Sequence, residues 1–310
     1  MKGEPRRVRS RRARWTLPAI VSVAVFLAGF AWIAYEVHYG TLISGWDGRV
    51  TEAFVAFRSP LRNRVFWGAT LLGNTPLLGA YVGGSVILLA AWGKWGAAVL
   101  FAAGVGLAQV MSSMLKASLD RARPPASLAL IDQPGSHSLP SGHAFMTLVV
   151  AGLLMYVFLR PGAPPRGAGP GGLWLGAARL GTVVVATAIL LLIGASRVYL
   201  GVHWASDVVA GWCVGAAWLI VVLAAVQRWG WVDRLSRGAH PPAGRRPRMV
   251  LLTLVVLAVL AAVVLAARAD PLLSRRPVFT RALCSDEVSL PHKESRAADT
   301  PTVSSRGRTT

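Results

Sequence analysis

The sequence predicts an all-α fold, a polytopic membrane helical bundle. Of its 310 residues 54% are hydrophobic and only 15% are charged, whereas soluble proteins carry about 25% charged residues. Seven uncharged runs follow one another along the chain, and glycine and alanine are frequent in them, as is usual where transmembrane helices pack closely. The net charge of +20 lies in the loops and tails, which favours contact with anionic lipid head groups over nucleic-acid binding.

The first element is an uncharged run over residues 15–35, preceded by a basic segment. Residues 1–14 contain seven basic side chains and one acidic one. The run has 21 residues, enough to cross a hydrocarbon layer of about 30 Å and more than the apolar part of a cleaved signal peptide. Arg11 and Arg12 faintly resemble a twin-arginine signal, but we interpret the run as an uncleaved anchor with a cytoplasmic start.

Six more uncharged runs define the remaining membrane elements. They cover residues 65–93, 95–115, 144–159, 180–196, 208–227 and 249–267. The first six runs of the chain form a predicted six-span core over residues 15–227. The last run is a predicted seventh transmembrane helix, outside that core.

The loops predict the orientation of the chain. Seven spans with a cytoplasmic start place 17 basic residues in the inside segments and eight outside, between spans, in agreement with the positive-inside rule. We therefore expect a multi-pass protein of the plasma (cytoplasmic) membrane with a cytoplasmic N-terminus. Residues 228–248 form a basic cytoplasmic loop, and the polar residues 268–310 form a disordered tail.

Polar residues interrupt the apolar pattern at three places, of which the first is residues 116–124. Lys116 and Arg123 are seven residues apart, which is two helical turns, so both would point the same way. Pro124 biases Arg123 away from helix and ends the third span there. The alternative is a basic pair whose side chains extend to the lipid head groups, and for Arg121 we prefer that interpretation.

The second polar segment, residues 140–143, directly precedes the fourth span. Ser141 is a plausible N-cap, and Gly142 lets a ligand approach the backbone. The helix N-terminus would offer free N–H groups to an anion, with His143 as a possible proton donor. The alternative is an ordinary capped helix start with an interfacial histidine. His137, in the loop nearby, is given no role.

The third polar segment is residues 196–207. Ionisable groups at a membrane boundary are costly and usually functional. If a helix begins near His203, Asp207 lies one turn away on the same face. Its carboxylate could hold one imidazole nitrogen and leave the other free for attack or proton transfer, while Arg197 could hold an anion beside it. The alternative is a capped helix start with a chance His–Asp pair.

On this topology all three polar segments fall on the outer face of the membrane. Their combined basic side chains, histidines, carboxylate and helix N-terminus suit an anion with several oxygens, such as phosphate. No cluster of carboxylates accompanies them that could hold Mg²⁺, so we expect metal-independent chemistry and no cofactor. Cys213 and Cys284 fall in an apolar run and in the polar tail, and we expect no disulfide between them.

Together the three segments resemble the three-part signature of the type 2 phosphatidic acid phosphatase (PAP2) superfamily. The matching positions are Lys116, Arg123, Pro124, Pro140, Ser141, Gly142, His143, Ser196, Arg197, His203 and Asp207. The superfamily includes membrane-bound lipid phosphatases and soluble vanadium haloperoxidases, and the seven apolar runs favour the membrane branch. The resemblance covers the six-span core but neither the seventh span nor the tail.

The resemblance implies a role for each matching polar residue. His203 would be the nucleophile that forms a phosphohistidine, Asp207 would orient it, and His143 would protonate the leaving oxygen and then activate water. The phosphoryl oxygens would be bound by Lys116, Arg123, Ser141, Gly142 and Arg197.

The resulting hypothesis is an integral membrane phosphatase that acts on a lipid phosphate or diphosphate. Phosphatidic acid, phosphatidylglycerol phosphate and undecaprenyl diphosphate are the candidate substrates, and membrane lipids are the expected partners. Two alternatives stay open: phosphotransfer to a lipid or sugar acceptor, and a non-catalytic lipid-binding or transport protein. We expect alanine at His203 or His143 to nearly abolish turnover, and Arg121→Ala to leave it intact.

Overall fold

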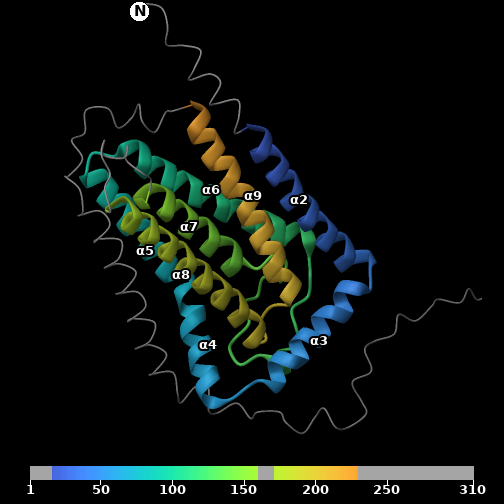
Figure 1. The fold of residues 1–310 in the computed structure, drawn as a ribbon. Coiled ribbons are helices and arrows are strands. Elements are labelled where there is room, and N and C mark those ends of the chain that lie inside the picture. The colour runs from blue at the N-terminus through green and yellow to red at the C-terminus, as the bar shows by residue number, and fades with distance from the viewer. Residues whose placement is uncertain (1–15, 160–170, 230–310) are drawn as a thin grey trace, which may run out of the picture. The chain divides into compact units, whose positions relative to one another are not determined.

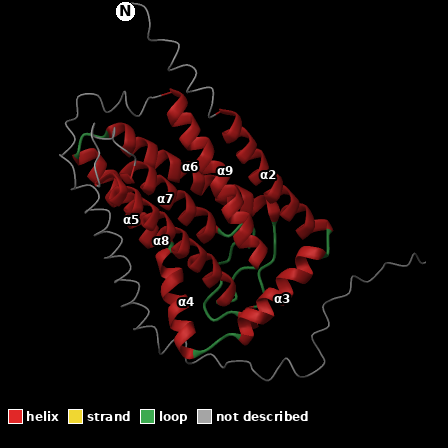
Figure 2. Ribbon diagram, viewed as in Figure 1, coloured by secondary structure: helices red, strands yellow, loops and turns green. Residues whose placement is uncertain are grey.

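The computed structural model describes residues 16–159 and 171–229, and within these ranges every regular element is a helix (Figures 1 and 2). The elements are α2 (Thr16–Tyr39), α3 (Leu42–Ala56), α4 (Pro60–Leu72), α5 (Thr75–Ala91), α6 (Trp95–Leu119), the short 3₁₀ turn η1 (Ala126–Leu128), α7 (Gly142–Leu159), α8 (Gly171–Tyr199) and α9 (Ala205–Trp229). The predicted basic N-terminal segment, the seventh span, the tail and nearly all of the loop at 228–248 lie outside the described residues.

Four of the described helices, α2, α6, α8 and α9, are long and apolar enough to cross a membrane. The pair α4 and α5, bent by 41°, would add a fifth if it is one span, and α7 is a shorter apolar helix. The prediction of an all-α polytopic membrane bundle is confirmed. The count of six spans in the core stays a prediction.

The predicted second span, residues 65–93, is two helices rather than one. α4 ends at Leu72, and α5 begins at Thr75 after Gly73 and Asn74. The Asn74 side chain accepts a 3.0 Å hydrogen bond from the backbone N–H of Leu77, and a proline lies in the first turn of α5. An Asn cap followed by proline starts a new helix, which an uninterrupted apolar run does not reveal.

Helix α3 was not predicted from the sequence. Its buried positions are Ile43, Asp47 and Thr51, which are spaced four residues apart and so lie on one face of the helix. Because two of these three residues are polar, the segment shows no apolar stripe. From the sequence alone the segment simply falls between the first two predicted spans.

Helix α7 lies at the centre of the bundle and packs against α5, α6, α8 and α9, while α9 also packs against α2. The fully buried side chains of Phe101, Phe145 and Leu153 form part of the core between these helices. The approach of α9 to α7 is close at Gly211, where a Cβ atom would lie 2.7 Å from the carbonyl oxygen of Ser141. Small residues at helix interfaces permit such packing in membranes, and here it brings the starts of α7 and α9 together.

Hydrogen bonds from other segments to its backbone hold the turn between α8 and α9 in place. Arg58, which follows α3, donates to the carbonyl oxygens of Tyr199 (2.8 Å) and Leu128 (2.7 Å). Leu130 N–H donates to the carbonyl of Leu200 at 2.9 Å. Gly201 has a positive φ of 71°, a left-handed conformation that glycine adopts without strain. The position of His203, two residues later, depends on this turn.

Gly201→Ala is expected to destabilise the protein strongly. An added Cβ would lie 2.2 Å from the backbone oxygen of Leu128, and that oxygen is held by Arg58. The left-handed backbone costs about 1–2 kcal/mol and overpacking about 1–3 kcal/mol, so the thermal unfolding midpoint in detergent should fall sharply. The matched control is Gly135→Ala, because a Cβ at Gly135 meets nothing within 4 Å. Equal midpoints for the two variants would contradict the role assigned to Gly201.

Candidate active site

The three polar segments meet where α6 ends and where α7 and α9 begin. The backbone N–H of Ser141, just before α7, donates to the carbonyl of Asp207 in α9 at 2.9 Å. The loop between α6 and α7 folds back on itself, since Ser138 N–H donates to the carbonyl of Arg121 at 2.9 Å. The first contact joins the second and third segments. The second contact joins the first segment to the loop that leads into the second.

His203 and Asp207 form a buried pair at the start of α9. His203 is 2% exposed and Asp207 0%. The Nδ1 atom of His203 lies 3.3 Å from Oδ2 of Asp207, and the same oxygen accepts a hydrogen bond from Trp204 N–H at 3.0 Å. The helix begins at Ala205 rather than at His203, but the pair still forms one turn apart. The other ring nitrogen, Nε2, faces Arg123, whose Nη1 is 3.2 Å away.

Three cations surround the free side of His203 or lie close to it. Arg123 also donates to the carbonyls of Val202 (2.6 Å) and Ser136 (2.8 Å). The Lys116 ammonium donates to the carbonyl of His137 at 3.0 Å. Arg197, 3% exposed, donates from Nη1 to the Thr70 hydroxyl at 2.6 Å. Backbone and hydroxyl oxygens thus hold all three side chains without neutralising their charge.

Lys116 and Arg123 converge for a reason other than the one predicted. α6 ends at Leu119, and Asp120 has a left-handed backbone with φ 39°, so Arg123 is not on the helix and the spacing of two helical turns does not apply. The loop instead returns Arg123 to the end of α6. Both side chains reach the same carbonyl, that of His137, at 3.0 and 3.4 Å.

Two buried polar atoms at this place have no hydrogen-bond partner within the described part of the chain: Oγ of Ser141 and Nε of Arg197. Buried polar groups are almost always paired, so two such atoms beside three cations indicate a site for an anion. Gly142 leaves room there, because a Cβ on it would lie 3.6 Å from Cε of Lys116. The ring of His143 lies beside Gly73, where a Cβ would be 3.2 Å from its Cδ2 atom.

Comparison with known proteins supports the resemblance noted in the sequence. The family described as the PAP2 superfamily matches residues 97–231, which contain all three polar segments. Residues 97–231 of the chain are therefore similar to the PAP2 superfamily.

Named relatives and a solved structure agree with this family. Phosphatidylglycerophosphatase B of Bacillus subtilis is 29% identical over 197 residues, 62% of this chain and 88% of that protein. Undecaprenyl-diphosphatase of Sulfolobus acidocaldarius is 29% identical over 105 residues, 34% of this chain and 41% of that one. The crystal structure of a transmembrane PAP2-type phosphatidylglycerolphosphate phosphatase from Bacillus subtilis, 24% identical, has a TM-score of 0.55 and covers 70% of this chain and 98% of that one. The two proteins share a fold.

Two interpretations made from the sequence are corrected by the structure. Ser141 precedes α7, but its hydroxyl caps nothing, since it makes no hydrogen bond. Arg121 is not an interfacial side chain directed at head groups: it is 9% exposed and forms ion pairs with Asp207 at 2.5 Å and with Asp47 at 2.7 Å. The expectation that Arg121→Ala leaves activity intact loses its basis.

Burial keeps the candidate nucleophile of the site neutral. Loss of hydration lowers the pKa of His203 well below its usual value, and Arg197, Arg123 and Lys116 lower it further. A neutral imidazole is the form that can act as a nucleophile. The same cations that would bind the substrate's phosphate therefore also hold His203 in its reactive form.

The pH profile of catalysis should reflect that shift in the pKa of His203. Because the pKa of His203 is lowered, the acid limb of the kcat/KM profile should lie below about pH 6.5, the ordinary pKa of histidine. Arg123→Gln removes a positive charge beside Nε2, so the pKa of His203 should rise and the acid limb should move to higher pH. The exposed Arg49 serves as control through Arg49→Gln, and one substrate is used throughout so that its own ionisation cancels. An unmoved acid limb in Arg123→Gln would contradict this assignment.

Proposed function

We propose that the protein hydrolyses a lipid phosphate or diphosphate through a phosphohistidine formed at Nε2 of His203, without a metal ion. The observation that carries the proposal is the surroundings of His203: Nδ1 faces a buried carboxylate, and Nε2 faces Arg123. The two unpartnered polar atoms, Ser141 Oγ and Arg197 Nε, supply donors that a phosphoryl group would satisfy.

In the first step Nε2 of His203 attacks phosphorus, a P–N bond forms and the P–O bond to the leaving group breaks. The leaving oxygen takes a proton from His143 and departs as the lipid alcohol, or as the lipid monophosphate when the substrate is a diphosphate. Asp207 accepts a hydrogen bond from the Nδ1–H of the imidazole and stabilises the positive charge that develops on the ring, as the carboxylate of a Ser-His-Asp triad does. Lys116, Arg123 and Arg197 stabilise the charge on the phosphoryl oxygens.

In the second step a water molecule attacks phosphorus and gives a proton to His143. The P–N bond breaks, inorganic phosphate leaves, and His203 returns to its neutral form. Both histidines thus end the cycle as they began it. If an alcohol took the place of water, the same intermediate would give phosphotransfer.

The substrate class follows from the site's location and from the names of the relatives. A site at the ends of membrane helices can take a phosphate head group while the lipid tail stays in the bilayer. Phosphatidylglycerol phosphate and undecaprenyl diphosphate correspond to the activities for which the two relatives are named, and phosphatidic acid has the same phosphomonoester chemistry. We propose that the site opens to the extracytoplasmic side, and a reporter fused at residue 165 should then be cytoplasmic.

The test is phosphate release by the purified protein in detergent with a chelator present. The substrates are phosphatidic acid, phosphatidylglycerol phosphate and undecaprenyl diphosphate, and His203→Ala is the control. Release that persists with chelator and is lost in the variant supports the proposal, and the rank order identifies the substrate. No release from any of the three would count against hydrolysis, and transfer of the phosphoryl group to added alcohols would then be measured.

A further inference from the structure

The two oxygens of the Asp207 carboxylate have different partners. Oδ2 faces His203 and accepts the N–H of Trp204, while Oδ1 accepts a 2.5 Å hydrogen bond from Nη1 of Arg121. The carboxylate therefore cannot rotate without breaking a charged hydrogen bond. The Arg121 guanidinium donates to Ser206, Asp207 and Asp47 and, among the described residues, makes no hydrogen bond to the imidazole, so its influence on His203 would pass through Asp207.

Arg121 is in turn fixed by a second buried carboxylate. Its Nη2 donates to Oδ2 of Asp47 at 2.7 Å, and Asp47 is 1% exposed. A guanidinium presents several donors in one rigid plane, which lets Arg121 hold both carboxylates at once. The partners lie far apart in the sequence, on α3, after α6 and in α9.

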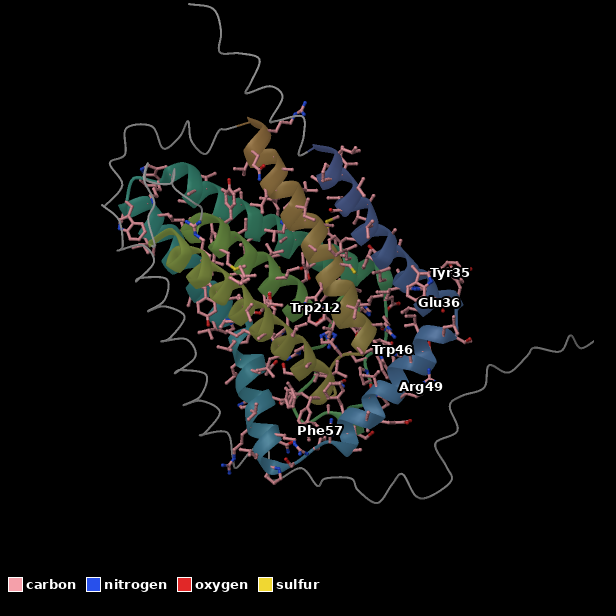
Figure 3. All side chains as sticks on the ribbon, viewed as in Figure 1. Tyr35, Glu36, Trp46, Arg49, Phe57 and Trp212 are labelled. Atoms are coloured by element: carbon pink, nitrogen blue, oxygen red, sulfur yellow. The ribbon has the colours of Figure 1, made fainter. Side chains whose placement is uncertain are left out.

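Asp47 also holds the start of α9 directly. Its Oδ1 accepts the backbone N–H of Ser206 at 2.9 Å, and its Oδ2 accepts the Ser206 hydroxyl at 2.5 Å. The first N–H groups of a helix lack partners within the helix, so Asp47 caps α9 from another helix. Asp47 is buried on α3, whereas Trp46 and Arg49 on the same helix, both labelled in Figure 3, are exposed.

We propose that Asp47 and Arg121 are positioning residues for catalysis: Asp47 fixes Arg121 and the start of α9, and Arg121 fixes the carboxylate of Asp207 that orients His203. This inference rests on the function proposed above and adds a residue, Asp47, that lies outside the 97–231 segment matched by the family. Neither residue touches the phosphate. Their loss should misalign the attacking nitrogen and leave substrate binding intact.

The kinetic test uses Asp47→Asn, which keeps the size of the side chain, and Arg121→Lys, which keeps the charge. Each should lower kcat by roughly 10- to 100-fold, as small misplacements of a reacting group do, with KM unchanged. Because Asp47 acts partly through Arg121 and partly at the start of α9, the double variant should be slower than either single variant but less slow than the two single effects combined. Glu52→Gln, an exposed carboxylate on the same helix, is the matched control and should retain wild-type kcat.

Additive effects on kcat, or a raised KM with normal kcat, would overturn the proposal. A second measurement does not need turnover: the ¹⁵N chemical shifts of the His203 ring, assigned by their absence in His203→Ala. We expect the wild type to carry its proton on Nδ1, and Asp47→Asn and Arg121→Lys to give a mixture of tautomers. Unchanged shifts in both variants would overturn the positioning role even if no substrate is hydrolysed, whereas an inactive wild type with the expected shifts would count only against the proposed function.

Discussion

His203→Ala should lower phosphate release by roughly 10⁴-fold or more, the scale expected when a nucleophile that forms a covalent intermediate is removed. The variant lacks the nitrogen atom that would bond to phosphorus, so a better leaving group cannot restore the rate. Turnover of a lipid phosphate and of an aryl phosphate, which has a better leaving group, should be lost together. The measurement is initial-rate phosphate release on both substrates with equal amounts of folded protein.

The control for this loss is another histidine near a membrane boundary. His38, at the end of α2, is exposed; its Nδ1 lies 3.1 Å from the backbone oxygen of Ala34, and its ring lies beside that of Tyr39. His38→Ala should retain wild-type rates. A phosphorylated enzyme trapped by rapid acid-free quenching should form in the wild type and in His38→Ala. Trapping a phosphorylated enzyme in His203→Ala would show that a different residue is the nucleophile.

His143→Ala should also lower the rate of lipid phosphate hydrolysis strongly, by about 10²–10⁴-fold, the usual contribution of a general acid or base. The two proposed steps of the reaction depend on His143 to different degrees. Protonation of the leaving oxygen matters for an alcohol and little for a phenolate that is stable as an anion. Single-turnover formation of the phosphohistidine from an aryl phosphate should therefore be much less affected than formation from a lipid phosphate.

The second step then separates His143 from a purely structural role. Hydrolysis of the phosphohistidine needs a base for water whichever leaving group has departed. In His143→Ala the phosphorylated enzyme should accumulate on an aryl phosphate, giving a burst followed by slow release. Equal losses on both substrates with no burst would mean that His143 only supports the fold of the site.

The membrane bundle was predictable because the length and apolarity of a helix are local properties of the sequence. The bend between α4 and α5 was missed, since a cap at Asn74 inside an apolar run does not change the mean hydropathy. The motif residues were found because unusual types recur at fixed spacings. Their convergence depends on the loop after Leu119, and helical periodicity gave the wrong reason for it.

Asp47 and Arg121 were missed for a different physical reason. Whether a charged side chain is exposed or buried depends on its partner, and here the partners are 74 and 86 residues away in the sequence. Near a membrane boundary an isolated arginine is most simply interpreted as facing lipid head groups. The spacing of Ile43, Asp47 and Thr51 on one helical face was a signal, but it contains no apolar stripe to draw attention to it.

The packing of α2 against α9 has a consequence for biosynthesis. These are the first and last described helices, yet they lie side by side (Figure 1). During synthesis α2 enters the membrane before every other described helix. It is apolar, and only 6% of its most apolar 18-residue window is buried by the rest of the bundle. It can therefore remain in lipid without its partner. His203 and Asp207 arrive only with α9. Under the proposed mechanism, a nascent chain in the membrane has no phosphatase activity until its last described helix is inserted.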